Sequence, residues 1–357
     1  MSSREDWLNR GFLLQDHPFE PVRDPIHGLD LRAVRVNLSK PLDIFAIQQL
    51  EGYFAQVGSV ATAVKEISDF LDGEGTSIDT ATPPVLLIEG PGGGGRKTLG
   101  NFVAHLMKAH CLTPPSFRTL PVTTGHFGRL LLEIRLRLEQ HFRQSNGDDT
   151  VLKSRDAFIK PEDPDETVLA GLFNSVAQQN LGLPMLVLMV DAVDFRNFDW
   201  IRKLHGMLKD LNVALIFLTK DNLVTELFRK ALGRGDYTGC AVRLTALTKQ
   251  DGIALLTQRL KIFRNPGAPS GMATLTPYEL AAIQWIFADT RGGDEPRAIK
   301  MVLNLCRVAM NRKLAELVQS NTALPAQAGS GMAPIGEQDL REAYAKSLQQ
   351  TSWGRQV

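Results

Sequence analysis

The fold is decided by LIEGPGGGGRKTL, residues 87–99, in which a run of glycines precedes Arg96 and Lys97. The stretch continues an apolar run, VLLIEG at 85–90, which has the composition of a buried strand, and it opens an amphipathic helical pattern. Glycines let successive backbone N–H groups turn inward around a phosphate, and the start of a helix adds the positive end of its dipole. A glycine run can also be a flexible linker, but a strand before it and a helix after it favour a phosphate-binding loop.

Two alignments of this stretch with the phosphate-loop pattern G-x-x-x-x-G-K-[ST] are open. Counting from Gly90 places Arg96 at the lysine position and Lys97 at the Ser/Thr position. Counting back from Lys97 and Thr98 restores both of those positions, but it puts Pro91 and Arg96 where the pattern has glycines.

The helix that follows the loop favours the first alignment. Leu99 lies three residues after Arg96, where the first inward-facing apolar residue of the helix is expected. Three residues after Lys97 stands Gly100, which has no side chain to bury. The candidate nucleotide-binding residues of the loop are Gly90, Gly92, Gly93, Gly94, Gly95, Arg96, Lys97, Thr98 and Leu99.

The first alignment has a consequence for the metal ion. The planar guanidinium of Arg96 can grip the β- and γ-phosphates of a nucleotide. The ammonium of Lys97 offers only hydrogen-bond donors and repels a cation. Thr98 could supply a hydroxyl ligand, one residue after the Ser/Thr position of the pattern. We therefore expect ATP and Mg²⁺ as cofactors, with nucleotide binding better supported than efficient hydrolysis.

Between residues 84 and 244, short apolar runs alternate with helical patterns. This alternation predicts an α/β fold with a doubly wound parallel sheet, because strands covered by helices on both faces are apolar throughout. The predicted strands are 85–90, 117–124, 185–191, 213–219 and 241–244. The predicted helices between them are 128–142, 166–179, 200–211 and 222–232.

The rest of the chain has a different pattern. After Leu244 it becomes helical, with helices predicted at 249–263, 277–289, 295–318 and 337–348, and a further helix is predicted at 44–71. Turn-forming stretches separate these parts. The predicted domains are an N-terminal segment and helix (1–75), the P-loop α/β core (76–246), a helical lid (247–320), and a linker with a C-terminal helix (321–357).

A second motif ends the predicted third strand, in LVLMVDAVD at 186–194. A carboxylate at this strand end can hold the magnesium shell opposite the loop, although an Asp there is also a common helix cap. Asp191 and Thr98 are therefore the candidate metal ligands. Ala192 stands where a Glu would polarise the attacking water, and Asp194 is the nearby substitute, so we expect slow hydrolysis.

The order of these motifs resembles that of the AAA+ P-loop ATPases, with a divergent Walker A loop. The resemblance rests on the glycine loop, the hhhhDxxD strand, the polar-ended strand ALIFLTKDN (214–222) and the helical region with RGGDEPR (291–297). It is strongest to the branch of origin-recognition-like and bacterial transposition-type ATPases and their STAND relatives. GFLLQDHPFEPVRD (11–24) is similar to a segment that packs beside the adenine pocket in bacterial members of this branch.

The resemblance implies roles for further residues. Arg297, in a G-x-P-R-like motif with one extra residue, would reach the γ-phosphate from the lid, although a proline near a helix start is also ordinary. Thr219 would orient water, with Asn222 as a second candidate. Arg229 or Arg234 would complete the site of a neighbouring subunit, although surface arginines are usually solvated.

Composition excludes several other classes of protein. The 40 Lys and Arg residues balance 39 Asp and Glu residues, which argues against a protein with an acidic or basic tail. The 3 cysteines are too scattered for a disulfide framework or a zinc site. The apolar stretches are too short to span a membrane, and the N-terminus does not resemble a signal peptide, so we expect a cytoplasmic protein.

The sequence thus predicts an ATP-binding protein whose nucleotide state controls homo-oligomer assembly or a partner interaction. Two alternatives stay open: a scaffold that binds nucleotide without hydrolysing it, and a DNA- or transposition-linked ATPase adaptor. Nucleic acid binding is not supported by the net charge of +1. The arginines within 129–143 are interleaved with glutamates, which is typical of an ordinary charged helix.

Overall fold

The computed structural model describes residues 3–15, 17–19, 54–73, 84–109, 119–123, 186–208, 213–269, 272–288, 293–320, 322–325 and 334–353. Contacts group the chain into two units. The sheet unit comprises Ala63–Gly90 and Leu99–Leu244, and the helical unit comprises Met1–Thr62, Pro91–Thr98 and Thr245–Val357. The glycine loop after Gly90 therefore belongs to the helical unit, although it continues a strand of the sheet.

The sheet unit is built on a parallel sheet, which has five strands among the described residues. These strands are β1 (Val85–Glu89), β2 (Thr119–Thr123), β3 (Leu186–Val193), β4 (Val213–Thr219) and β5 (Gly239–Arg243), in the order β2-β3-β4-β1-β5. Every pairing is parallel, and all five residues of β1 are buried. The predicted α/β fold with a parallel sheet is confirmed.

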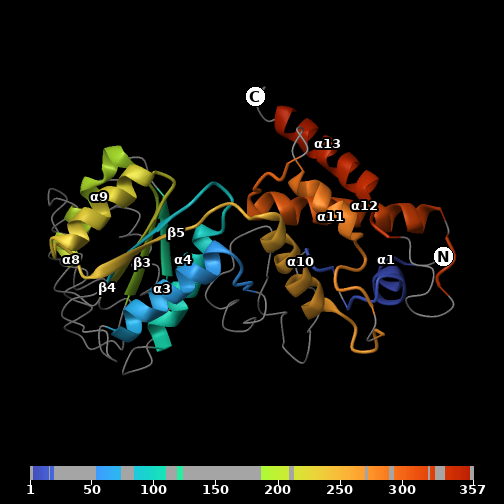
Figure 1. Ribbon diagram of the computed structural model, residues 1–357, viewed down its shortest axis with the longest axis horizontal. Coiled ribbons are helices and arrows are strands. Elements are labelled where there is room, and N and C mark those ends of the chain that lie inside the picture. Colours follow the sequence, from blue (N-terminus) through green and yellow to red (C-terminus); the bar gives the residue numbers. More distant parts are fainter. Residues whose placement is uncertain are drawn as a thin grey trace, which may run out of the picture. The chain divides into compact units, whose positions relative to one another are not determined.

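Helices cover both faces of this sheet (Figure 1). The helices α3 (Ser59–Gly73) and α4 (Arg96–Ala109) lie on one side, and α8 (Asp199–Leu208) and α9 (Asn222–Gly233) lie on the other. Gly100 allows α4 to approach the sheet, because a Cβ at this position would lie 2.6 Å from the sulfur of Met189. The lack of a side chain at Gly100 therefore serves the packing of α4 against β3.

The helical unit contains α10 (Lys249–Phe263), α11 (Leu280–Phe287), α12 (Ile299–Gln319) and α13 (Glu337–Trp353). These helices bury an apolar core that includes Phe263, Phe287 and Leu340. Gly252 makes room for the ring of Phe287, since a Cβ at Gly252 would lie 2.1 Å from the ring. No helix in the described ranges is long and apolar enough to cross a bilayer.

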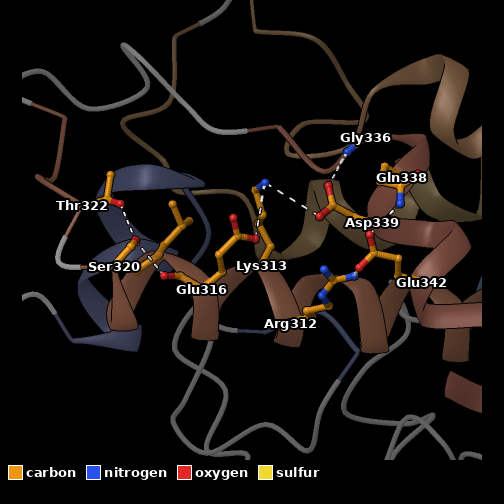
Figure 2. A network of polar contacts seen from close by, with 10 residues as sticks. Arg312, Lys313, Glu316, Ser320, Thr322, Gly336, Gln338, Asp339 and Glu342 are labelled. Carbon is orange, nitrogen blue, oxygen red and sulfur yellow. Dashed lines mark hydrogen bonds and ion pairs between the residues drawn. The ribbon is translucent and has the colours of Figure 1, made fainter.

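Polar contacts join α12 to α13 (Figure 2). Arg312 forms an ion pair with Glu342, and the ammonium of Lys313 lies 3.8 Å from a carboxylate oxygen of Asp339. Asp339 also accepts a hydrogen bond of 2.9 Å from the backbone N–H of Gly336. Because partly exposed ion pairs contribute at most about 1 kcal/mol each, this network mainly orients α13 on α12.

The N-terminal segment is part of the helical unit. It forms a short helix α1 (Arg4–Asp6) and a π-helical turn η1 (Trp7–Gly11), and then pairs with the end of α10. Leu14 bridges Arg264 in antiparallel fashion, and the N–H of Asn265 donates to the carbonyl of Leu13 at 2.9 Å. Residues 20–24 of the predicted N-terminal motif lie outside the described residues, and its role beside an adenine stays a prediction.

Two predicted helix starts are wrong. The N-terminal helix begins at Ser59, since 54–58 are not helical and Gly58 has a left-handed φ of 52°, while 44–53 lie outside the described residues. The helix α12 begins at Ile299, four residues later than predicted. Arg297 exchanges two backbone hydrogen bonds, of 2.8 and 2.9 Å, with Leu247, and this pairing keeps the segment before α12 extended.

The other predicted elements agree in place, with smaller shifts at their ends. The predicted bounds of β4 and α10 are confirmed, whereas α11 begins at Leu280 and α13 extends to Trp353. The predicted helices 128–142 and 166–179 lie outside the described residues. The predicted domain boundaries divide the chain by sequence, whereas the contacts group residues 1–62 with the helices after Leu244.

Candidate phosphate-binding site

The glycine-rich loop forms a tight turn between β1 and α4. The N–H of Gly94 donates to the carbonyl of Pro91 at 3.1 Å. Gly93 and Gly95 have φ values of 75° and 91°, in the left-handed region that residues with a Cβ rarely adopt. The helix α4 begins directly after Gly95, at Arg96. The backbone therefore requires glycine at 93 and at 95.

The loop carries backbone donors that fit an anion. Within the described residues, the N–H groups of Gly92, Gly93 and Gly95 donate to no acceptor. Such donors, next to the positive end of a helix, are satisfied when the oxygens of a phosphate accept from them. Gly92 and Gly93 are exposed, so a ligand can reach them. The loop thus fits the phosphates of the expected ATP.

Thr219 links three segments at the carboxyl edge of the sheet. Its carbonyl accepts a hydrogen bond of 3.1 Å from the N–H of Gly90, the first residue of the loop. Its hydroxyl donates to the carbonyl of Val193 at 2.6 Å and accepts from the N–H of Asp221 at 3.0 Å. Thr219 is fully buried. It therefore fixes the ends of β1 and β3 on β4, and its predicted role in orienting water stays a prediction.

Asp191 lies in a bulge near the end of β3. Val190 pairs with Phe217 and Val193 with Thr219, so β3 has one more residue than β4 between these pairs. Bulges of this kind redirect side chains and are frequent beside functional sites. Asp191 is partly exposed and pairs with Thr123 of β2. The assignment of Asp191 as a metal ligand stays a prediction.

Asp194 is exposed and accepts a hydrogen bond of 2.9 Å from the N–H of Arg196. This contact caps the short 3₁₀ helix η4 (Phe195–Asn197). The carboxylate of Asp221 accepts from the N–H of Phe195 and from that of Leu223, each at 3.0 Å. Both aspartates therefore hold backbone turns at this edge of the sheet.

The sequence interpretation missed an ion pair next to the loop. Glu89 directly precedes Gly90, is buried, and accepts from Nε of Arg243 at 2.7 Å. The two residues stand opposite each other in the pairing of β1 with β5. A signal was present, since each is the charged end of an otherwise uncharged strand. The pair fixes β5 at the point where the chain enters the loop.

Within the helical unit, the glycine loop contacts the start of α12. The carbonyl of Gly93 accepts a hydrogen bond of 3.0 Å from the N–H of Lys300. A Cβ at Gly95 would lie 3.3 Å from Cδ1 of Ile299. The N-cap residue of α12 is Ala298, which makes no side-chain cap bond. The carbonyl of Gly93 therefore accepts from the N–H of Lys300, a group at the helix start that an N-cap side chain would otherwise satisfy.

Arg297 lies before α12 and is held by the end of α11. Its Nε donates to the carbonyl of Ile286 at 3.0 Å, and a terminal nitrogen lies 2.9 Å from a carboxylate oxygen of Glu295. Its backbone pairs with Leu247. The side chain therefore contacts protein groups, and its assignment to the γ-phosphate stays a prediction.

The two candidate inter-subunit arginines are exposed near the end of α9. Arg229 donates to the carbonyl of Ala241 at 3.2 Å, and Arg234 forms an ion pair of 2.6 Å with Asp236. Both contacts lie within the chain, so their predicted role toward a neighbouring subunit stays untested.

The metal site is the least developed part of the candidate site. No group of three His, Cys, Asp or Glu side chains in the described ranges could hold a metal ion. Lys97 and Thr98 are half-buried in the first turn of α4. The assignment of Asp191 and Thr98 as metal ligands therefore stays a prediction.

No family model and no curated protein matches the sequence. Among solved structures, the chain is similar to the ORC2 protein of Aeropyrum pernix in its ADPNP-ADP complexes, at 11% identity and a TM-score of 0.49, over 80% of this chain and 67% of that one. It is similar to Drosophila ORC bound to DNA, at 15% identity and a TM-score of 0.46, over 92% and 70% of the two chains. Cdc6p of Pyrobaculum aerophilum is 16% identical with a TM-score of 0.49, over 79% and 65%.

Proposed function

We propose that this protein binds ATP through the loop 90–98, as an ATPase of the AAA+ type with a divergent Walker A loop. One observation carries the proposal. Between a buried parallel strand and a helix, the loop holds two glycines in left-handed conformations and presents backbone donors without acceptors in the described part of the chain. This arrangement is the one in which backbone N–H groups surround phosphate oxygens.

The loop geometry also supports the first alignment. In the pattern G-x-x-x-x-G-K-[ST], the second glycine directly precedes the lysine at the helix start. Here the glycine that directly precedes α4 is Gly95, with φ of 91°, and Arg96 is the first helical residue. This position supports assigning Arg96 to the lysine role, in which its guanidinium would donate to the phosphate oxygens.

Two substitutions and one contact support slow hydrolysis. Lys97 occupies the position of the metal-binding hydroxyl, and Ala192 that of the residue that would activate water. Asp194, the substitute, is engaged in capping η4. When bound, Mg²⁺ would neutralise phosphate charge, and the chain would hold it through Asp191 and Thr98. The same features favour the alternative of a scaffold that binds nucleotide without hydrolysing it.

The contact between the loop and α12 supports a role in signalling the nucleotide state. Because Gly93 bonds to Lys300, a change in the loop conformation on ATP binding acts directly on the start of α12. A ligand shifts such an equilibrium only through different contacts in the two states. The proposed outcome is control of homo-oligomer assembly or of a partner interaction. The basic helix considered for DNA binding lies outside the described residues.

Thermal unfolding of the purified protein with and without ATP tests the proposal. A ligand that binds only the folded state at one hundred times its Kd stabilises it by about 2.7 kcal/mol, which raises the unfolding midpoint by several degrees. We expect this rise with ATP and a smaller one with AMP, since the loop binds phosphates. An unchanged midpoint at millimolar ATP would contradict the proposal.

A further inference from the structure

Two cationic side chains stand at the start of α12, within the same unit as loop residues 91–98. Arg297 precedes the helix by two residues, and Lys300 is its second residue. A cation in this region could bind the terminal phosphates of a nucleotide. The contacts of the two side chains differ, and this difference decides between them.

The guanidinium of Arg297 already bonds to groups of the protein. Its guanidinium donates to the carbonyl of Ile286 at 3.0 Å and to that of Ala288 at 3.4 Å, and it pairs with Glu295 at 2.9 Å. The two carbonyls belong to the end of α11, where backbone acceptors have no partner within the helix. Moving Arg297 toward a phosphate would leave these carbonyls without their donor, which makes such a movement costly.

Lys300 lies along the glycine loop instead. Its N–H donates to the carbonyl of Gly93 at 3.0 Å. A Cβ placed on Gly93 would lie 2.9 Å from Cβ of Lys300 and 3.8 Å from its Cδ, so the stem of the lysine runs past the loop. The Cδ atom is two bonds from the ammonium. Lys300 is exposed, and it forms no ion pair within the described ranges.

We propose that Lys300, rather than Arg297, is the residue of the helical unit that binds the terminal phosphates of ATP. This assignment rests on the proposed function. Gly93 carries one of the loop N–H groups that have no acceptor in the described part of the chain, and the stem of Lys300 runs beside this residue. An ammonium donates charge-assisted hydrogen bonds to phosphate oxygens without the planar geometry that a guanidinium needs. Arg297 is then a positioning residue that holds α11 against the segment before α12.

Under this assignment, Lys300 and Arg297 affect the binding of ATP and AMP differently. Lys300 contributes to the affinity for nucleotides that carry terminal phosphates and contributes nothing for AMP. Arg297 contributes to the stability of the helical unit and leaves the preference for ATP over AMP unchanged. The ratio of the AMP and ATP dissociation constants therefore reports on the proposal, whereas a general loss of folding lowers both affinities together.

The experiment measures ATP and AMP binding by calorimetry on the full chain and on four variants. Lys300→Met removes the ammonium and keeps the stem, and Lys300→Arg keeps the charge. Arg297→Met removes the contacts to α11. Lys346→Met is the matched control, because Lys346 is an exposed lysine on α13 in the same unit. The unfolding midpoint of each variant is measured alongside.

We expect Lys300→Met to weaken ATP binding by about tenfold or more, which corresponds to the loss of one hydrogen bond to a charged group, with AMP binding unchanged. Lys300→Arg should keep most of the ATP preference, and Arg297→Met should lower the midpoint at an unchanged AMP/ATP ratio. A wild-type ratio in Lys300→Met, or a ratio lost in Arg297→Met alone, would overturn the inference while ATP binding stands. A wild-type protein that binds no ATP would overturn the proposed function and this inference together.

Discussion

Thr219 joins three parts of the sheet unit through one buried residue. Its carbonyl holds the N–H of Gly90, and its hydroxyl bonds to the carbonyl of Val193 and to the N–H of Asp221. The same side chain is predicted to orient water on a nucleotide. Because its hydroxyl proton is already donated to Val193, that role would require the acceptor side of the oxygen or a rotation of the hydroxyl.

The loop residues Arg96 and Lys97 are expected to differ in their contribution to ATP affinity. Arg96 directly follows the left-handed Gly95, and the first alignment gives it the lysine position and gives Lys97 the position of a metal ligand. We therefore expect Arg96→Ala to weaken ATP binding more than Lys97→Ala does, by about tenfold for one lost charge-assisted bond. Calorimetry on the two variants checks the order. The reverse order would favour the second alignment, with Thr98 as the magnesium ligand.

At the scale of the elements, the sequence predicted which segments form strands and helices better than where they begin. Continuous apolar runs predicted the strands, since burial on both faces leaves little choice of residue. The start of α12 was missed because it depends on the pairing of Arg297 with Leu247, which are distant in the sequence. The contact of Gly93 with Lys300 was missed for the same reason.

Glycines that permit close approaches were also beyond sequence reasoning. A Cβ at Gly239 would lie 1.8 Å from the carbonyl oxygen of Val85, so β5 can pair with β1 as it does only with glycine there. Gly100 and Gly252 have the same effect between a helix and its neighbour. Propensity alone marks such residues as weak points of a strand or helix, because it carries no information on what packs against them.

The start of α12 offers a direct test of the capping contact from Gly93. Ala298 has the extended N-cap conformation, but the N–H of Lys300, from which an N-cap side chain would accept, already donates to the carbonyl of Gly93. Ala298→Ser should therefore raise the free energy of unfolding by less than the about 0.5–2 kcal/mol that is typical of a new cap. Thr248→Ala is the matched control, since Thr248 caps α10 and its removal should cost about 0.5–2 kcal/mol. Denaturant unfolding measures both variants. A full capping gain in Ala298→Ser would contradict the contact from Gly93.

At the scale of the whole molecule, the candidate residues are divided between the two units. Asp191, Asp194 and Thr219 belong to the sheet unit, whereas loop residues 91–98, Arg297 and Lys300 belong to the helical unit. Most of the candidate phosphate-binding residues, together with Thr98, are therefore grouped with the helices, whereas Asp191 and the candidate catalytic residues are grouped with the sheet.

The hydrolytic rate is a property of the assembled site. Lack of a group that activates water typically costs about 10²–10⁴ in rate, so we expect slow turnover by the wild-type protein. Ala192→Glu should raise the rate, and Asp191→Asn should lower it further. Phosphate release at several protein concentrations checks this, because assembly through Arg229 or Arg234 would raise the rate. Brisk magnesium-dependent turnover that Asp194→Asn abolishes would contradict the expectation.

The central claim, that the glycine loop binds the phosphates of ATP, is tested most directly by calorimetric titration of ATP into the wild-type protein, Gly95→Val and Gly206→Val. Gly95 has φ of 91° in the loop, whereas Gly206 lies exposed in α8 with no atom within 4 Å of an added Cβ. We predict that Gly95→Val remains folded but loses ATP binding, and that Gly206→Val binds like the wild type. Wild-type ATP affinity in a folded Gly95→Val variant would contradict the claim.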